Sequence, residues 1–257
     1  MAGHKQQGFE GHWDAHAGAG ISSAKETEAR SFLQPALEQM HRATGPMRIL
    51  DVGCGDGVHA VALAREGLSP HRYHGVDLSA RAVILAKTRV RAVTEDPARF
   101  FAGSALALPF RSSTFDVIFS YGVIGYTGSP GDVMDEMVRV CRPGGLLGVW
   151  VYPRIGGVAG WMFSCGRALC RRLGGQLSRG IVYAVVPLLG VLPVRSGTNL
   201  RNSTWRQCVE LVEVNLLPRV LDYYSWEEVV GWFRARCLDI VCVNRTRPIE
   251  VWARVPE

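Results

Sequence analysis

The stretch MRILDVGCGDG, residues 47–57, decides the fold, because an apolar run leads directly into a loop that contains three glycines. The apolar run predicts a short buried strand over residues 48–52. Gly53, Gly55 and Gly57 lack a Cβ, so backbone N–H groups and the start of a following helix can approach a bound molecule closely. The stretch therefore predicts a strand, a ligand-binding loop and a helix in succession.

Strand-like and helix-like patterns alternate after this loop. We expect helices over residues 58–65 and 133–140, and a third helix that Ser79 caps and that runs to about residue 93. Strands are expected over residues 73–76, 99–102, 115–121 and 145–152. Strands separated by helices form parallel βαβ units. Near the end, a helix over 225–236 precedes a hairpin of two β-rich runs, 239–244 and 250–255, so the last strand is expected to be antiparallel. The predicted fold class is α/β, a doubly wound Rossmann-like sheet with a helical insert after strand five.

Asp77 ends the second predicted strand, in the stretch GVDLS at 75–79. A carboxylate at this strand tip can accept hydrogen bonds from both hydroxyls of a ribose, which leaves a dinucleotide and S-adenosylmethionine as candidate ligands. The third glycine of the dinucleotide fingerprint G-x-G-x-x-G is missing, because position 58 is valine. Asp51 and Asp56 would also repel a pyrophosphate, whereas S-adenosylmethionine carries an ammonium and a sulfonium. The loop therefore favours S-adenosylmethionine.

At this point the chain resembles a known family. ILDVGCGDG at 49–57 is similar to the first motif of class I S-adenosylmethionine-dependent methyltransferases, and further motifs follow in the family's order. They are GVDLS at 75–79, GSALALPF at 103–110, STFDVIFSYGVI at 113–124 and VCRPGGLLGV at 140–149. The similarity is strongest to the branch that includes ubiquinone and menaquinone methyltransferases. It implies a seven-stranded sheet with an antiparallel last strand, and S-adenosyl-L-methionine as the cofactor.

The resemblance also implies which residues hold this cofactor. Around the methionine portion they are Asp51, Gly53, Cys54, Gly55, Ser120 and Tyr121. Around the ribose and adenine they are Asp77, Leu78, Ser104, Ala105 and Leu106. Asp77 would bind the ribose hydroxyls and Leu78 would pack on the adenine. Relatives often have aspartate where this chain has Ser104, so we expect weaker adenine recognition, or recognition through backbone and water.

The chain divides into four segments on this interpretation. Residues 1–46 are an N-terminal lid or helical segment, with a helix expected around 27–43. Residues 47–152 form the S-adenosylmethionine-binding core, and residues 223–257 complete its sheet. Between these two parts, residues 153–222 form an apolar, arginine-rich helical cap.

The insert is the best indication of the substrate. Residues 153–209 contain eight arginines and no aspartate, glutamate or lysine. Over 158–173 the apolar residues share one helix face, and the opposite face is polar and basic: Gly160, Ser164, Arg167 and Arg171. Either this helix caps the sheet edge with its arginines in water, or it also rests on an anionic membrane and admits a lipid-like acceptor. The apolar run at 181–194 would line the pocket in either case.

Composition restricts the location of the protein. The chain has 257 residues and a net charge of +6, which permits anionic partners without requiring them. Its seven cysteines are scattered, with no C-x-x-C pair, which argues against disulfides and for a reducing compartment. Neither a secretory leader nor a long apolar run is present in the sequence. We therefore expect a cytoplasmic protein, with peripheral membrane contact under the second interpretation of the insert.

Methyl transfer is an in-line displacement at a carbon that the sulfonium already activates, so alignment and exclusion of water are the main needs. We therefore assign no catalytic residue and expect no metal ion. Candidates for the substrate pocket are Trp13, His16, Tyr126 and Arg154. Tyr126 follows strand four on the acceptor side, and Arg154 follows strand five, where it could pair with an acidic substrate. Trp13 and His16 would belong to a lid.

The sequence thus predicts a methyltransferase that acts on a small, hydrophobic or lipid-like acceptor. One alternative is an enzyme that modifies RNA or another nucleic acid. The insert has no lysines and no alternation of basic and aromatic residues, and the position after strand four reads SYGV, so nucleic-acid binding is disfavoured. The other alternative is a non-catalytic regulatory subunit that binds the cofactor. Turnover of any acceptor would exclude this alternative.

Overall fold

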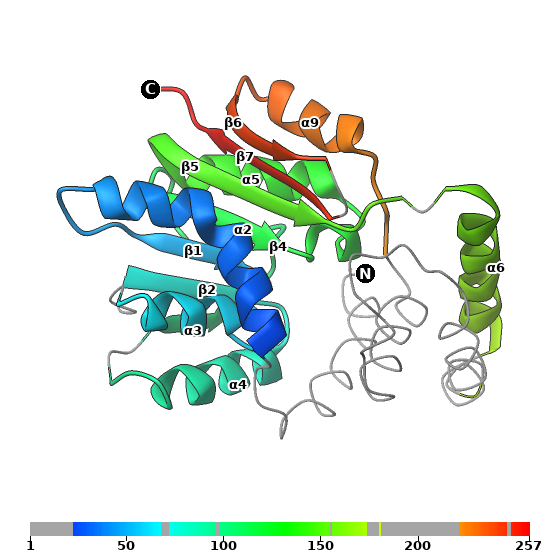
Figure 1. Cartoon of the computed structure of the whole chain (residues 1–257), viewed down its shortest axis with the longest axis horizontal. Coiled ribbons are helices and arrows are strands. Elements are labelled where there is room, and N and C mark those ends of the chain that lie inside the picture. Colours follow the sequence, from blue (N-terminus) through cyan, green and yellow to red (C-terminus); the bar gives the residue numbers. More distant parts are fainter. Residues whose placement is uncertain are drawn as a thin grey trace.

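Figure 1 shows the computed structural model of the chain, in which helices lie on both faces of a central sheet. The structure describes residues 23–67, 72–95, 98–154, 156–173, 180, 221–245 and 248–257. Seven strands pair in the order β3-β2-β1-β4-β5-β7-β6. Their bounds are β1 Ile49–Val52, β2 Tyr73–Asp77, β3 Arg99–Ala102, β4 Phe115–Tyr121, β5 Cys141–Val151, β6 Asp239–Asn244 and β7 Ile249–Arg254. All pairs from β3 to β5 are parallel, and β7 is antiparallel to β5 and β6, so the predicted fold class is confirmed.

The described helices cover the two faces of the sheet unequally. One face carries α2 Ser23–Arg42, α3 Val58–Arg65 and α4 Ala80–Arg91, whose buried side chains share one core cluster. The other face carries α5 Pro130–Val140 and α9 Trp226–Arg234, which share the second cluster. The short 3-10 helix η2 Ile124–Tyr126 follows β4, and α6 Gly157–Leu173 follows β5. In Figure 1, α6 lies to one side of the sheet.

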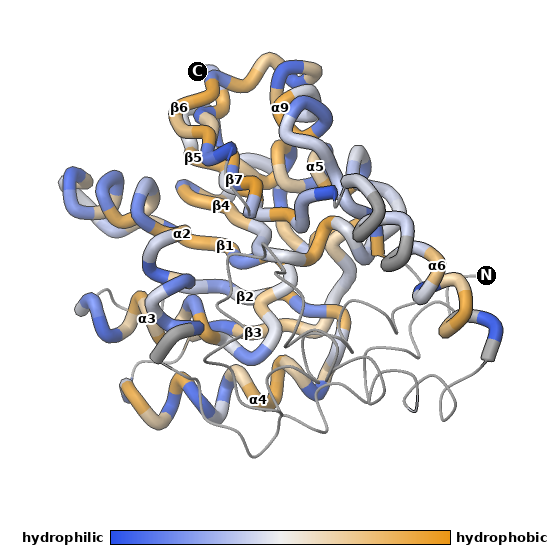
Figure 2. Tube along the Cα trace, turned by 45° about the vertical axis from the view of Figure 1, so that its right-hand side comes forward, coloured by the Kyte–Doolittle hydropathy of each residue, from blue (hydrophilic) through white to orange (hydrophobic). Residues whose placement is uncertain are grey.

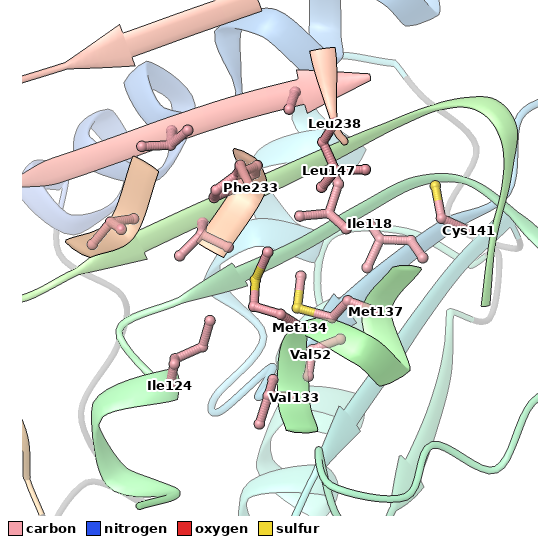
Figure 3. Packing of buried hydrophobic residues seen from close by; sticks show 14 of the residues in the cluster. Val52, Ile118, Ile124, Val133, Met134, Met137, Cys141, Leu147, Phe233 and Leu238 are labelled. Carbon is pink, nitrogen blue, oxygen red and sulfur yellow. The ribbon is translucent and has the colours of Figure 1, made fainter. Parts of the chain in front are cut away.

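Helix α5 is held on the sheet by an apolar stripe. Val133, Met134, Met137 and Val140 recur at helical spacing and are fully buried. Figure 3 shows the two methionines of α5 packed among side chains of the sheet, close to Phe233 of α9. Unbranched methionine side chains fill irregular gaps of this kind. The packing fixes α5 beside the loop that leads into β4.

Helix α2 packs on the opposite face of the sheet. Its Phe32 is 1% exposed, and the ring centroid lies 5.8 Å from that of Phe119 in β4 and 5.0 Å from that of Trp252 in β7. The helical part of the predicted N-terminal segment is therefore packed against the sheet core. Residues 1–22, which would supply a lid, lie outside the described residues.

Strand β5 and helix α5 both begin earlier than expected, for local reasons. Strand β5 begins at Cys141, because Cys141 already pairs with Phe115 before a register shift brings Leu146 beside Val117. Helix α5 begins at Pro130, since proline is favoured in the first turn, where its missing N–H is not needed.

The strand order reverses between β1 and β4, which is where parallel sheets of this kind bind their ligands. The segment that follows β5 also leaves and returns at this edge of the sheet. Tyr224 N–H donates to the Tyr152 carbonyl at 3.1 Å, and Arg154 N–H donates to the Tyr224 carbonyl at 2.9 Å. Asp222 N–H donates to the Gly125 carbonyl of η2 at 2.8 Å. Both ends of the insert are therefore anchored next to the carboxyl ends of β4 and β5.

Figure 2 shows the distribution of hydropathy, with apolar residues along the strands and also along α6. Among the helices that the structure describes, none is long and apolar enough to cross a bilayer.

Candidate functional site

The glycine loop, residues 53–57, connects β1 to α3 at the carboxyl edge of the sheet. Gly53 has φ +82° and Gly57 has φ +80°, in the left-handed region that favours glycine. A Cβ on Gly53 would lie 2.1 Å from Cγ2 of Val123, and one on Gly57 would lie 2.9 Å from Cβ of Ala86. The packing of the chain therefore requires bare backbone here, independently of any ligand.

Asp77 joins the end of β2 to this loop. Its Oδ2 accepts the Gly55 N–H at 2.9 Å, and its Oδ1 accepts the Ser79 N–H at 2.9 Å. Ser79 caps α4 with its own hydroxyl, so the capping role predicted for Ser79 is confirmed. Burial raises the pKa of Asp77, and the two N–H bonds oppose that rise. Each carboxylate oxygen keeps a lone pair for another donor, such as a ribose hydroxyl.

Asp51 in β1 is fully buried, and both of its hydrogen bonds fall on one oxygen. Oδ2 accepts the Tyr73 hydroxyl at 2.5 Å and lies 3.2 Å from Nδ1 of His59. Oδ1 has no hydrogen-bond partner among the described residues. Because an unsatisfied buried polar atom is costly, this oxygen fits a bound cationic or N–H group. The ammonium of a methionine portion meets that requirement.

Asp56, the aspartate within the glycine loop, has a different environment from Asp51. Asp56 forms an ion pair with Arg89 of α4, and both side chains are largely buried. Asp56 was expected to repel a pyrophosphate together with Asp51. That expectation is wrong for Asp56, because Arg89 balances its charge. The negative charge around the loop rests on Asp51 and Asp77.

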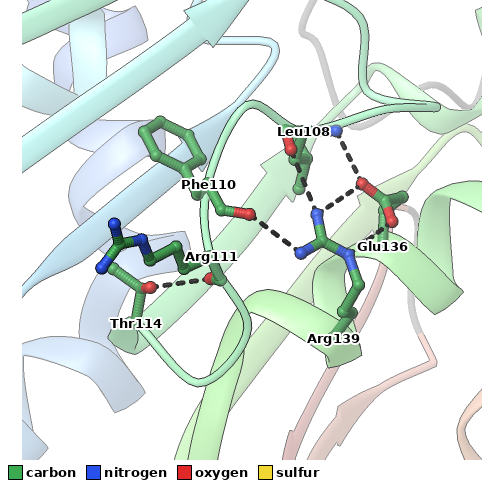
Figure 4. A network of polar contacts seen from close by, with 6 residues as sticks. All are labelled: Leu108, Phe110, Arg111, Thr114, Glu136 and Arg139. Atoms are coloured by element: carbon green, nitrogen blue, oxygen red, sulfur yellow. Dashed lines mark hydrogen bonds and ion pairs between the residues drawn. The ribbon is translucent and has the colours of Figure 1, made fainter.

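Residues 103–114 connect β3 to β4 without a helix, and α5 holds this connection in place (Figure 4). Arg139 donates to the carbonyls of Phe110 and Leu108 at 2.8 and 3.1 Å. Its partner Glu136 accepts the Leu108 N–H at 2.7 Å. The hydrogen bond from Arg139 lowers the pKa of Glu136. This network fixes the loop that carries the predicted adenine contacts.

Two exposed leucines lie at the predicted adenine position. Leu78 is 52% exposed and Leu106 is 41% exposed. Gly103 N–H donates to the Asp77 carbonyl at 2.9 Å. This bond holds the start of the connection 103–114 against β2. Ser104 Oγ already accepts the Leu106 N–H at 3.2 Å, so one of its lone pairs is used within the loop.

Cys54 and Ala105 differ from the other predicted contacts because their side chains face inward. Cys54 is 2% exposed, its thiol lies against Gly75, and burial raises its pKa well above the ordinary value. Ala105 is half-buried against the core cluster that α5 and α9 share. Cys54 therefore offers only its backbone to a ligand.

The end of β4 places two predicted residues on opposite faces of the sheet, since successive side chains of a strand alternate. Ser120 is fully buried, and its hydroxyl has no partner among the described residues. Tyr121 stacks on Trp150 with ring centroids 4.4 Å apart and donates to Oε1 of Glu28 at 2.6 Å. This last bond links α2 to the tip of β4 beside the glycine loop.

Tyr126 belongs to a group of tyrosines at the carboxyl ends of β4 and β5. Its ring centroid lies 6.2 Å from that of Tyr152, which lies 6.4 Å from that of Tyr223. Burial raises the pKa of Tyr126 well above its ordinary value. Sequence reasoning missed Tyr152 and Tyr223, and the only available signal was their position next to the two ends of the insert.

The other substrate-pocket candidates are placed differently. Arg154 forms an ion pair with Glu228 of α9, with its NH2 group 2.9 Å from Oε1. This contact directs the guanidinium toward the start of α9. Trp13, His16 and the run 181–194 lie outside the described residues.

Helix α6 spans the predicted segment, and on the polar face Gly160 and Arg167 are buried whereas Ser164 is exposed. Arg167 is 7% exposed, donates to the Leu221 carbonyl at 2.6 Å and lies 5.6 Å from the ring centroid of Tyr223. Trp161 and Leu169, on the apolar face, are 68% and 48% exposed. The expectation that Arg167 belongs to a solvent-facing basic surface is therefore wrong, because this arginine anchors α6 to the chain that returns to the sheet.

Comparison with known proteins agrees with this geometry. A family described as a methyltransferase domain matches residues 50–149. The methyltransferase GfsG of Streptomyces halstedii is 36% identical over 103 residues, which is 40% of this chain and 36% of that protein. A demethylmenaquinone methyltransferase of Lactiplantibacillus plantarum is 30% identical over 119 residues, which is 46% of this chain and 50% of that protein. The matched part thus spans half or less of each relative.

Solved structures agree in fold. The magnesium protoporphyrin IX methyltransferase ChlM of Synechocystis PCC 6803, solved with bound S-adenosylhomocysteine, superimposes with a TM-score of 0.57 at 12% identity. The superposition covers 98% of this chain and 95% of that one. At this identity the likeness concerns the fold, and it includes the sheet described above.

Proposed function

Residues 50–149 are a class I S-adenosylmethionine-dependent methyltransferase domain, and from this premise we propose that the whole chain transfers a methyl group to a small, hydrophobic or lipid-like acceptor. S-adenosylmethionine is the cofactor, as the glycine loop with Asp51 and Asp77 beside it predicts. The observation that carries the assignment is the unpartnered Oδ1 of Asp51, a buried anionic oxygen at the end of β1.

Each part of the cofactor would meet a matching group of the chain. Asp51 would accept from the ammonium, and Asp77 would accept from the ribose hydroxyls while it holds Gly55 in place. Leu78 and Leu106 would enclose the adenine ring between exposed apolar surfaces. The bound cofactor supplies an activated methyl group, so the chain has to orient the acceptor and exclude water.

The acceptor side is proposed to lie at the ends of β4 and β5. Tyr126, Tyr152 and Tyr223 gather there, and the insert begins and ends beside them. Aromatic side chains bind apolar ligands over a large area, and their hydroxyls can orient a polar group. The demethylmenaquinone methyltransferase among the relatives has a small-molecule acceptor in its name, which supports this proposal.

We further propose that α6 contacts an anionic membrane surface. Trp161 and Leu169 are exposed on one side of the helix, and Arg172 near its end is exposed as well. Exposed aromatic and aliphatic side chains together with arginine are typical of helices that lie in a lipid interface. A lipid-like acceptor would then reach the tyrosine group from the membrane.

The test is label transfer from methyl-labelled S-adenosylmethionine to fractions of a lipid and metabolite extract. We expect label in an organic-soluble fraction and none in an RNA fraction. Label only in RNA would favour the nucleic-acid enzyme, and S-adenosylhomocysteine binding without any transfer would favour a regulatory subunit. Binding of NAD without binding of S-adenosylhomocysteine would contradict the assignment itself.

A further inference from the structure

The Asp51 carboxylate is held between two donors that come from different elements. Tyr73 is the first residue of β2, and its hydroxyl reaches Oδ2 at 2.5 Å. His59 is the second residue of α3, and its Nδ1 lies 3.2 Å from the same oxygen. The three residues are 0 to 3% exposed, so no bulk water competes for these contacts.

The chemistry of the carboxylate assigns the direction of both hydrogen bonds. An ionised carboxylate only accepts, so the Tyr73 hydroxyl and the Nδ1–H of His59 both donate. Two donors on one oxygen fix the rotation of the carboxylate about its bond to Cβ. The other oxygen, Oδ1, then keeps one direction and has no partner among the described residues.

We propose that Tyr73 and His59 are positioning residues that hold Oδ1 of Asp51 toward the ammonium of the cofactor's methionine portion. The proposal rests on the proposed function. It adds that cofactor affinity depends on two residues that do not themselves touch the cofactor.

The surroundings of His59 argue against a purely structural role. Its ring centroid lies 4.9 Å from that of Tyr121, 5.2 Å from that of Phe119 and 6.1 Å from that of Phe32. An apolar ring would pack well among these aromatic side chains. Buried ionic and polar groups are often replaceable by apolar residues without loss of stability, so packing alone does not explain an imidazole here.

The test is a cycle between protein variants and two ligands, measured by calorimetry on the full chain. The ligands are S-adenosylhomocysteine and its deaminated analogue, which lacks only the amino group. For Tyr73→Phe we expect about a tenfold loss of affinity for S-adenosylhomocysteine, as for a weakened hydrogen bond to a charged group. We expect less than about a twofold change for the deaminated analogue, because coupled sites are not additive.

His59 offers a rescue experiment, because asparagine can place a donor near the position of Nδ1. We expect His59→Asn to keep most of the affinity for S-adenosylhomocysteine, and His59→Phe to lose about as much as Tyr73→Phe. Tyr224→Phe is the matched control, since Tyr224 is also a buried tyrosine and its hydroxyl has no partner among the described residues. It should leave binding of both ligands unchanged.

Equal losses for the two ligands would overturn the proposal, because they would indicate a general distortion of the loop. It is also overturned if no variant loses affinity, or if the parent does not prefer S-adenosylhomocysteine over the deaminated analogue. If Tyr73→Phe does not fold, the comparison of His59→Asn with His59→Phe decides. A parent that binds neither ligand contradicts the proposed function instead.

Discussion

The Oδ2 atom of Asp77 accepts the backbone N–H of Gly55 at 2.9 Å, so the tip of β2 holds the glycine loop directly. The other oxygen of this carboxylate, Oδ1, accepts the N–H of Ser79, the residue that caps α4. One side chain therefore fixes the shape of the loop and offers its remaining lone pairs to a ligand. The loop and the predicted ribose contact are consequently not independent.

Replacement of Asp77 tests this dual role. We expect Asp77→Ala to weaken S-adenosylhomocysteine binding by ~1.5–3 kcal/mol, the range for a hydrogen bond to a charged group. Calorimetry measures the loss, and circular dichroism should report a folded protein. Ser79→Ala is the control: it should lower the free energy of unfolding by about 1 kcal/mol through the lost helix cap and leave affinity unchanged. Unchanged affinity in Asp77→Ala would exclude the ribose role.

A pair of glycine substitutions tests the backbone of the site. Gly53→Ala should lower the free energy of unfolding by at least ~1–2 kcal/mol from positive φ alone, with a further loss from the contact with Val123. Gly231→Ala, in α9 with nothing within 4 Å of its added Cβ, should raise it by about 0.5–1 kcal/mol. Denaturant unfolding measures both. Equal effects at the two positions would contradict the strained geometry of the loop.

The Glu136–Arg139 pair predicts a pH dependence. The hydrogen bond from Arg139 lowers the pKa of Glu136 below its ordinary value near 4.5. A carboxyl group with a depressed pKa stabilises the folded state above its ordinary pKa, and that contribution is lost as the pH falls through the folded value. The parent should therefore lose stability more steeply than Glu136→Gln below about pH 5. Parallel stability curves for the two proteins would show that the pair contributes nothing.

Membrane contact is tested by separating the two faces of α6. The parent should co-sediment with anionic vesicles, and binding should fall with salt, because each arginine contributes ~1 kcal/mol near acidic lipid and is screened beyond a Debye length. Trp161→Ser combined with Arg172→Gln should abolish co-sedimentation and leave S-adenosylhomocysteine affinity unchanged. Arg167→Gln should instead lower the melting temperature, since its bond to the Leu221 carbonyl is buried. Absence of vesicle binding by the parent at every salt concentration would favour the simple cap.

The sequence predicts the cofactor half of the site because the determinants of that prediction are local. One turn favours the glycines at 53, 55 and 57. One ligand favours the aspartate at the tip of the next strand. The alternation of strands and helices likewise predicts parallel pairing, and residues 50–149, which hold most of these motifs, match a methyltransferase domain.

Helix α6 marks the limit of such reasoning. Helical periodicity says which residues share a face, but not which face meets the rest of the protein. Trp161 on the apolar side is exposed, and Arg167 on the other side is buried, because the Leu221 carbonyl and the ring of Tyr223 contact its guanidinium. Those partners lie more than fifty residues further along the chain, and no local sequence pattern predicts the contact.

The sequence by itself determined the fold class, the glycine loop and the identity of the cofactor, since backbone freedom and charge at these positions depend on near neighbours. The tertiary structure decided which donors hold Asp51, where Arg167 lies and which tyrosines meet at the ends of β4 and β5. Tyr73 and Asp51 come together only because β1 and β2 pair in a register that places Ile49 beside Tyr73. Such contacts depend on strand register and on the packing of distant segments, and a linear pattern specifies neither.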